Sequence, residues 1–144
     1  MKEPLLNSTA TARMVVGDTD LASALPMASG DAFPAVLATA RMVALMEIAS
    51  ARLLHPCLGA GELSVGVSVE VTHTAPTPKG ATVMAEARYL GREGKLFLFE
   101  IVASDQGGEI GRARHKRAIV SVDRLQAGAS KRNPANESGQ TNVA

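Results

Sequence analysis

Alternation between apolar and polar residues is the feature that most restricts the fold of this chain. From Leu63 to Thr72 the apolar residues occupy one parity and small or polar residues the other, which is the pattern of a half-buried strand. Three further strand patterns follow, at residues 81–89, 95–104 and 110–122. Glycine-containing turns separate the last three. The sequence therefore predicts an antiparallel meander.

One segment before these strands has the pattern of a long helix. It runs from Phe33 to His55, with Pro34 suited to the first turn and Asp31 to a capping role. A shorter strand is expected around Ala12–Val16. One helix and about five strands predict an α+β domain, in which a curved antiparallel sheet wraps one long central helix.

The length of 144 residues allows one domain with a real core, but not two. We expect this domain to occupy residues 1–125. Residues 126–144 are polar or small and lack periodicity, which predicts a flexible C-terminal tail. The helix is apolar on nearly all sides, whereas one sheet covers only one side. Leu45, Ile48 and Ala49 are left over, so we expect a homodimer.

Composition argues against several classes of partner. The net charge is +1 and the chain has only four aromatic residues (three Phe, one Tyr), so nucleic acid is not an expected partner. The single cysteine, Cys57, cannot form an internal disulfide, which favours a reducing compartment. Neither a membrane-spanning stretch, a signal peptide nor metal-ligand spacing is present. We expect a cytoplasmic protein.

Glu47 lies on an apolar stripe of the predicted helix. At about 100° per residue it projects in the same direction as Val43, whereas Arg41 and Arg52 project about 140° to 160° away from that stripe. Thr39 lies two turns earlier and about 80° round the helix, so it could flank the same cavity. An ionisable group that faces a core needs a partner or a purpose.

His73 follows the alternating strand on its apolar parity. Unless a bulge intervenes, its imidazole faces the helix that carries Glu47. An inward carboxylate or histidine is, by itself, usually a satisfied core group. The joint placement of an acid, an imidazole and the nearby Thr39 hydroxyl favours a site for acyl transfer.

Three segments resemble the fluoroacetyl-CoA thioesterase family of hotdog-fold enzymes. They read FPAVLATARMVALME at Phe33–Glu47, VTHTAPTP at Val71–Pro78 and EIGRARHKRAIV at Glu109–Val120. The family's catalytic threonine and glutamate are eight residues apart, and its histidine follows after twenty-six. Thr39, Glu47 and His73 have the same spacing, and the resemblance extends over Asp18–Leu125.

The resemblance implies a dimeric hotdog protein, with active sites at the subunit interface, that hydrolyses a short acyl-CoA such as fluoroacetyl-CoA. It also implies that Gly66 and Arg117 contact the acyl group and that Phe33 is a gating aromatic. Gly30 stands where the family enzyme has a second aromatic residue. Coenzyme A is part of the substrate, so neither a cofactor nor a metal is expected.

Two roles for Glu47 are open under this interpretation. It could attack the thioester carbonyl to give an anhydride, or act as a base on a water molecule. His73 would move the proton, and Thr39 would position Glu47 or the carbonyl. Two alternatives to a thioesterase also remain: an acyl-CoA-binding module without turnover, and a hotdog dehydratase.

Parity within residues 110–122 leaves the direction of Arg117 open. Arg117 shares its parity with His115, but valines at the end of the segment lie on the other parity. The remaining bases, Arg112, Arg114 and Lys116, form either a solvated strand face or a docking site for the phosphates of coenzyme A.

Overall fold

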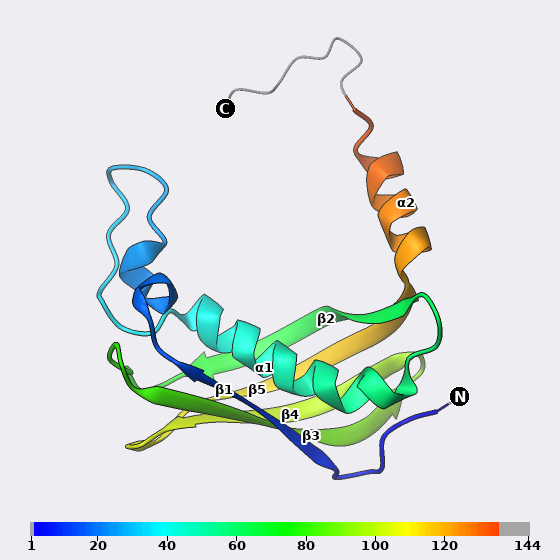
Figure 1. The fold of residues 1–144 in the computed structure, drawn as a ribbon, viewed down its shortest axis with the longest axis horizontal. Helices are drawn as coiled ribbons and strands as arrows, with labels where there is room; N and C mark the ends of the chain where they lie inside the picture. Colours follow the sequence, from blue (N-terminus) through cyan, green and yellow to red (C-terminus); the bar gives the residue numbers. More distant parts are fainter. Residues whose placement is uncertain (1, 136–144) are drawn as a thin grey trace.

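Five antiparallel strands curve around one helix in the computed structural model of this chain, which describes residues 2–135 (Figure 1). The strands are β1 Thr9–Val15, β2 Glu62–His73, β3 Thr82–Glu93, β4 Leu96–Asp105 and β5 Gly108–Ser121. The α-helices in this range are α1 Thr39–Leu54 and α2 Val122–Arg132, and short 3-10 helices lie at Asp18–Asp20, Ala22–Ala24 and His55–Cys57. The predicted α+β architecture is confirmed. None of the helices within residues 2–135 is long and apolar enough to cross a membrane.

The core lies between α1 and the inner face of the sheet. Its largest members are Tyr89, Phe97 and Phe99, which are fully buried, and the Tyr89 and Phe99 ring centroids are 5.7 Å apart. These rings pack beneath the buried face of α1, to which Met42, Leu45, Met46, Ala49, Ser50 and Leu54 contribute. Burial of such large apolar side chains is the main source of stability for a domain of this size.

The buried face of α1 differs from the predicted one. Leu45 and Ala49 were expected to remain for a partner subunit, but both are buried within the chain, and only Ile48 of that set is exposed. Glu47 borders the buried face, and its side chain is 40% exposed. The prediction was wrong here because α1 is apolar nearly all round, so periodicity alone does not select the face that the aromatic core covers.

α1 begins at Thr39, six residues later than predicted. The preceding backbone is extended: Leu37 N–H donates to the Thr77 carbonyl, and Ala38 N–H donates to the Asp20 carbonyl. These long-range bonds engage donors that a helix starting at Phe33 would direct elsewhere. Asp31 does not cap α1.

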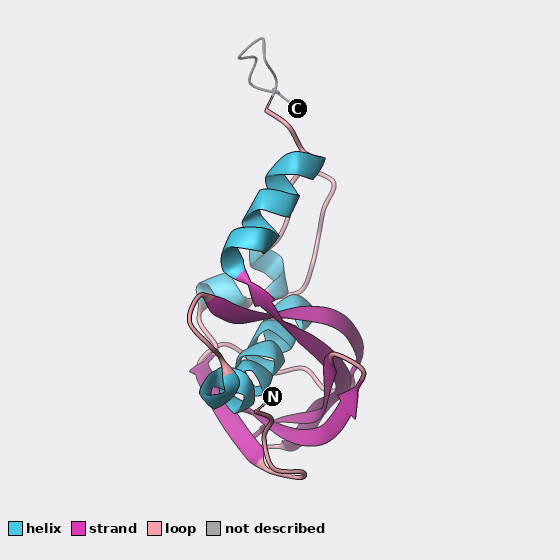
Figure 2. Cartoon of the chain, turned by 90° about the vertical axis from the view of Figure 1, so that its right-hand side faces the viewer, coloured by secondary structure: helices cyan, strands magenta, loops and turns pink. Residues whose placement is uncertain are grey.

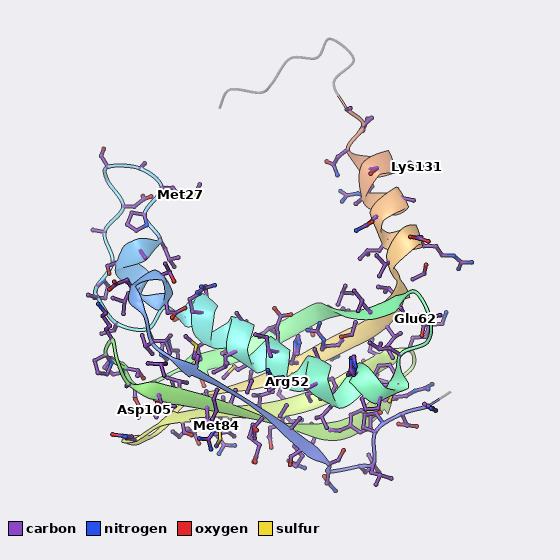
Figure 3. All side chains as sticks on the ribbon, in the orientation of Figure 1. Met27, Arg52, Glu62, Met84, Asp105 and Lys131 are labelled. Carbon is purple, nitrogen blue, oxygen red and sulfur yellow. The ribbon has the colours of Figure 1, made fainter. Side chains whose placement is uncertain are left out.

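Asp31 instead closes a turn in the preceding loop, where it accepts hydrogen bonds from the backbone N–H groups of Met27 and Ala28 at 2.8 and 3.0 Å. The loop projects from the body of the protein, and Met27 lies near its tip (Figure 3). The carboxylate is therefore used locally, by backbone donors that precede it in the chain, and it is not available to cap a helix that follows it.

β2 is an edge strand that contains a β-bulge. The sheet order is β1-β3-β4-β5-β2, so β2 has a neighbour on one side only. Its register with β5 shifts between Gly66 and Ser68, which leaves Val67 as the extra residue. Because side chains alternate with a period of two, the bulge changes which parity faces α1. Gly66 and His73 are seven residues apart, an odd number that would place them on opposite faces of a regular strand. Both nevertheless pair with inward-facing residues of β5, namely Arg117 and Gly111.

The prediction that residues 63–73 present one continuous apolar face is therefore wrong before the bulge. Leu63 and Val65 pair with Val120 and Ala118, which lie on the opposite face of β5 from Arg117. Leu63 is 54% exposed, and Val67 and Val69 are also exposed. An apolar edge strand of this kind leaves a row of backbone donors and acceptors available for pairing.

The first part of the predicted C-terminal tail is helical. Residues 122–132 form α2, which projects away from the sheet (Figures 1 and 2). Ser121 caps it by accepting a hydrogen bond from Arg124 N–H, and Lys131 and Arg132 lie in its last turn, where positive charge is favourable. These local signals accompany a helix that has no buried residues and leaves Leu125 exposed. Residues 136–144 of the predicted tail lie outside the described residues.

Candidate active site

Thr39 and His73 are brought together at one end of α1. Thr39 is the first residue of α1 and His73 the last of β2, and the Thr39 Oγ1 and His73 Nδ1 atoms are 2.8 Å apart. The other ring nitrogen, His73 Nε2, is buried without a hydrogen-bond partner among the described residues. A buried polar atom without a partner is costly, so this nitrogen is the natural contact for a substrate atom or water.

The Thr39–His73 pair lines an open cleft of about 380 Å³. Its other walls come from the loop before α1 and the segment after β2, and include Pro34, Val36 and Pro76. Phe33 lies next to Pro34 in that loop and is 51% exposed. The cleft combines apolar walls with a hydroxyl and an imidazole, as a small-molecule site requires.

Glu47 and Arg117 form a second polar group farther along α1. Arg117 Nη1 donates to Glu47 Oε1 at 2.9 Å, and Arg117 lies on the buried face of β5. Its remaining donors contact Ser64: Nε donates to Ser64 Oγ and Nη2 to the Ser64 carbonyl, each at 3.0 Å. The guanidinium is thus held on both edges, and a buried positive charge of this kind requires such partners.

His115 belongs to the same group, although it was not among the predicted site residues. Its Nδ1 lies 2.8 Å from the Ser68 carbonyl, and its Nε2 lies 3.1 Å from Arg117 Nη1. Burial lowers the pKa of His115, and the positive charge of Arg117 acts in the same direction, against the Ser68 hydrogen bond and Glu47. The parity shared with Arg117 was the only sequence signal that could have identified it.

Gly66 provides the space in which Glu47 lies. A Cβ atom at this position would collide with Glu47 Oε1 and would lie 3.2 Å from His115 Cε1. Gly66 also pairs with Arg117 in the sheet. The absence of a side chain therefore lets the carboxylate approach the strand and reach the guanidinium.

The structure does not join the three predicted catalytic residues in one hydrogen-bonded set within the chain. Thr39 and Glu47 are eight residues apart on α1, which corresponds to about 12 Å along the helix axis. Thr39 is bonded to His73, whereas Glu47 is bonded to Arg117. The chain thus carries two separate polar groups along α1, Thr39 with His73 and Glu47 with Arg117, which we call half-sites.

The other bases of β5 face outward. Arg112, Arg114 and Lys116 form ion pairs with Glu109, Glu100 and Glu93 at 2.9, 3.5 and 3.2 Å. All three pairs are solvent-accessible, so each contributes little to stability. Of the two interpretations that the sequence left open, this geometry favours a solvated strand face.

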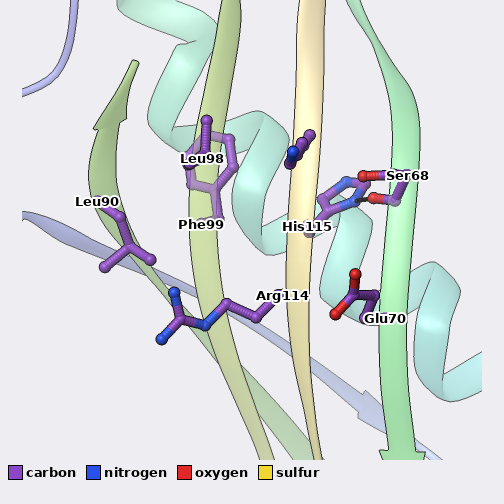
Figure 4. A pocket seen from close by; sticks show the side chains of 8 residues that line it. Ser68, Glu70, Leu90, Leu98, Phe99, Arg114 and His115 are labelled. Carbon is purple, nitrogen blue, oxygen red and sulfur yellow. Dashed lines mark hydrogen bonds between the residues drawn. The ribbon is translucent and has the colours of Figure 1, made fainter. Parts of the chain in front are cut away.

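A separate cavity of about 180 Å³ opens on the face of the sheet opposite α1 (Figure 4). Ser68, Glu70, Leu90, Leu98 and Arg114 contribute to its wall. His115 also lines it, but Thr39, His73, Glu47 and Arg117 do not, so the cavity is not the candidate site. Among the described residues, no group of three or more His, Cys, Asp or Glu is placed to hold a metal ion.

Comparison with known proteins identifies the family. A family model described as "Fluoroacetyl-CoA-specific thioesterase" matches residues 16–123. The fluoroacetyl-CoA thioesterase of Streptantibioticus cattleyicolor is 41% identical over 103 residues, which cover 72% of this chain and 74% of that protein.

Solved structures agree with this assignment. The structure of the fluoroacetyl-CoA thioesterase FlK matches with 34% identity and a TM-score of 0.87, covering 92% of this chain and 100% of that one. A hot-dog-like protein from Thermanaerovibrio acidaminovorans matches in fold, at 23% identity and a TM-score of 0.77, covering 92% and 95% of the two chains. The chain therefore belongs to the fluoroacetyl-CoA-specific thioesterase family of hotdog-fold thioester hydrolases.

Proposed function

We propose that this chain hydrolyses a short acyl-CoA, with fluoroacetyl-CoA among its substrates, to the free acid and coenzyme A. The observation that carries the proposal is the pair of half-sites on α1. Thr39 and His73 offer an unpartnered imidazole nitrogen beside a cleft, and Arg117 holds the carboxylate of Glu47. The matched relatives named for fluoroacetyl-CoA supply the substrate class.

Glu47 has two chemically balanced routes in this proposal. As a nucleophile, one carboxylate oxygen attacks the carbonyl carbon and the C–S bond breaks, giving an anhydride that water hydrolyses. As a base, Glu47 takes a proton from water, whose oxygen attacks the carbonyl, and the C–S bond breaks as the tetrahedral intermediate collapses to the acid. In either route His73 delivers a proton to the departing thiolate. Thr39 fixes the imidazole through its 2.8 Å contact with Nδ1.

The two half-sites come closer together in a homodimer, which forms a second part of the proposal. The support is β2, an edge strand with exposed Leu63, Val67 and Val69. Antiparallel pairing of two copies of β2 about its midpoint would place Gly66 of one copy opposite Val69 of the other. Val69 is four residues from His73, whereas Gly66 of the same chain is seven residues away. The Glu47 half-site of one copy would thus approach the Thr39–His73 pair of its partner.

Three further residues take part in binding the acyl group. Phe33, exposed beside the cleft, acts as a gate, while Gly66 and Arg117 contact the acyl group. Arg117 supplies positive charge, which favours a small, polarised acyl group over a long alkyl chain. Gly30 leaves one side of the gate open, because no atom lies within 4 Å of the position of its Cβ. A cytoplasmic location fits the unpaired Cys57.

The test of activity is thiol release from fluoroacetyl-, acetyl- and a medium-chain acyl-CoA. We expect hydrolysis of the short substrates, and at least a ~100-fold loss of kcat/KM in Glu47→Ala. Glu70→Ala is the matched control, because Glu70 is an exposed glutamate on the outer parity of β2. Tight binding of acyl-CoA without thiol release would identify a binding module instead, and hydration of an enoyl-CoA would identify a dehydratase.

The test of assembly is light scattering at micromolar concentration. Val67→Lys introduces a charge at the centre of the exposed edge of β2, and should give a monomer with reduced activity. Val15→Lys is the control, because Val15 is an exposed valine of β1, the other edge strand. A wild-type protein that is monomeric and fully active would contradict the interface site.

A further inference from the structure

His115 is a buried titratable group that the proposed mechanism does not use. It is 2% exposed and packs against Phe99, with the two ring centroids 6.4 Å apart. An imidazole in such surroundings needs partners for both nitrogens, because each polar atom has been removed from water. The partners that it has determine its protonation state.

The tautomer of His115 follows from the chemistry of its neighbours. The Ser68 carbonyl can only accept a hydrogen bond, so His115 Nδ1 must carry a proton and donate. A guanidinium can only donate, so His115 Nε2 must accept from Arg117 Nη1 at 3.1 Å. Both contacts are satisfied together only by the neutral ring protonated at Nδ1.

This arrangement connects the bulge of β2 to the carboxylate of Glu47. Ser68 is the first paired residue after the bulge, and its carbonyl accepts from His115. Arg117 Nη1 is shared, because it lies 3.1 Å from His115 Nε2 and 2.9 Å from Glu47 Oε1. His115 Nε2 itself lies 3.8 Å from Glu47 Oε1, so its influence on the carboxylate passes through Arg117.

We propose that His115 is a positioning residue, which fixes the guanidinium of Arg117, and through it the carboxylate of Glu47, in the orientation used for thioester hydrolysis. The inference rests on the proposed function for the role of Glu47. Ser64 holds the Nε and Nη2 donors of Arg117, and His115 is the acceptor that fixes Nη1 beside Glu47. Removing that acceptor frees Nη1 to leave the carboxylate.

The experiment compares variants at position 115 with fluoroacetyl-CoA as substrate. His115→Phe keeps an aromatic ring in an apolar site and removes both hydrogen bonds. We expect it to lower kcat at least ~10-fold with little change in KM, since misplacement of a catalytic group costs rate. His115→Gln retains an acceptor near the position of Nε2 and should recover most of that loss. His55→Gln, at an exposed histidine, is the control.

Two further measurements separate positioning from a general effect on folding. In an Arg117→Lys background, His115→Phe should cause no additional loss of kcat, because its effect passes through Arg117. If His115→Phe does not fold, His115→Asn takes its place. Its amide N–H can donate to the Ser68 carbonyl, but its side chain is too short to place an acceptor at the position of Nε2 beside Arg117, and kcat should fall similarly. A folded His115→Phe or His115→Asn variant with wild-type kcat would overturn the proposal, as would additive losses in the double variant.

A readout independent of turnover distinguishes failure of this proposal from failure of the proposed function. The ¹⁵N–¹H resonances of the Arg117 guanidinium should be resolved in the wild type and in His115→Gln, and should broaden in His115→Phe. If the wild type releases no thiol but the resonances behave this way, only the proposed function fails. If they are the same in all three proteins, His115 does not fix Arg117.

Discussion

The two half-sites along α1 differ in how completely their polar atoms are satisfied. At the start of the helix, the Thr39–His73 pair faces an open cleft, and His73 Nε2 has no partner among the described residues. In the middle of the helix, Arg117 is bonded to Glu47, Ser64 and His115 through Nε, Nη1 and Nη2. Under the proposed function, the first half-site would receive a ligand and the second would hold a charge in place before the ligand arrives.

This difference predicts that loss of His73 from the Thr39–His73 half-site lowers activity more than loss of His115 from the Glu47–Arg117 half-site. His73→Ala removes the imidazole that delivers the proton in the proposed mechanism, so kcat/KM should fall at least ~100-fold while the protein remains folded. Steady-state thiol release measures the loss, and circular dichroism checks folding. His55→Ala, at an exposed histidine, should behave as wild type. Near-normal kcat/KM in folded His73→Ala would show that the imidazole is not used.

A single added methyl group at Gly66 should disturb the Glu47–Arg117 half-site sterically, with a smaller effect than loss of His73. In Gly66→Ala the new methyl group collides with Glu47 Oε1, so the carboxylate must move away from Arg117. We expect a loss of about 1–3 kcal/mol in the free energy of unfolding, typical of overpacking, together with a lower kcat. Urea denaturation and thiol release measure the two effects.

The matched control is Gly30→Ala, because no atom lies within 4 Å of the position of its Cβ. It should leave the free energy of unfolding unchanged. If Gly66→Ala is as stable as Gly30→Ala and as active as the wild type, the close approach of Glu47 to β2 is not required for the site.

Sequence and structure agree on one half-site more fully than on the other. The alternating strand and the family spacing placed Thr39 and His73 on elements that do meet. The approach of Glu47 to Arg117 depends on the bulge at Val67, and a bulge is set by pairing with β5 rather than by the residues of β2 alone. The start of α1 was also missed, because long-range bonds from the segment before it decide where the helix begins. His115 was missed because parity did not reveal which face of β5 is buried.

Burial of His115 beside the Glu47–Arg117 half-site should also make the free energy of unfolding depend on pH. Burial lowers the pKa of His115 below its ordinary value of 6.5. As pH falls below about 6.5, the unfolded chain therefore binds a proton that the folded chain binds only at lower pH, and the free energy of unfolding decreases. The slope is at most about 1.4 kcal/mol per pH unit. Urea denaturation from pH 7.5 to 5 should show a shallower decrease in His115→Gln than in wild type or His55→Gln. Parallel curves would mean that His115 titrates normally.

The smallest expected effect comes from the outer face of the sheet, where Lys116 is the sequence neighbour of Arg117 but points the opposite way. Its ammonium pairs with Glu93 at 3.2 Å, and both side chains are solvent-accessible. Lys116→Gln should therefore change the free energy of unfolding by less than about 1 kcal/mol, because exposed ion pairs are weak. If the outer bases are only a solvated face, KM for fluoroacetyl-CoA should also stay unchanged. A several-fold rise in KM that vanishes at high salt would instead assign Lys116 to the phosphates of coenzyme A, since screening weakens such contacts. The outer face of β5 would then be part of the substrate site, and the contrast between its two faces would lie in which end of the acyl-CoA each one binds.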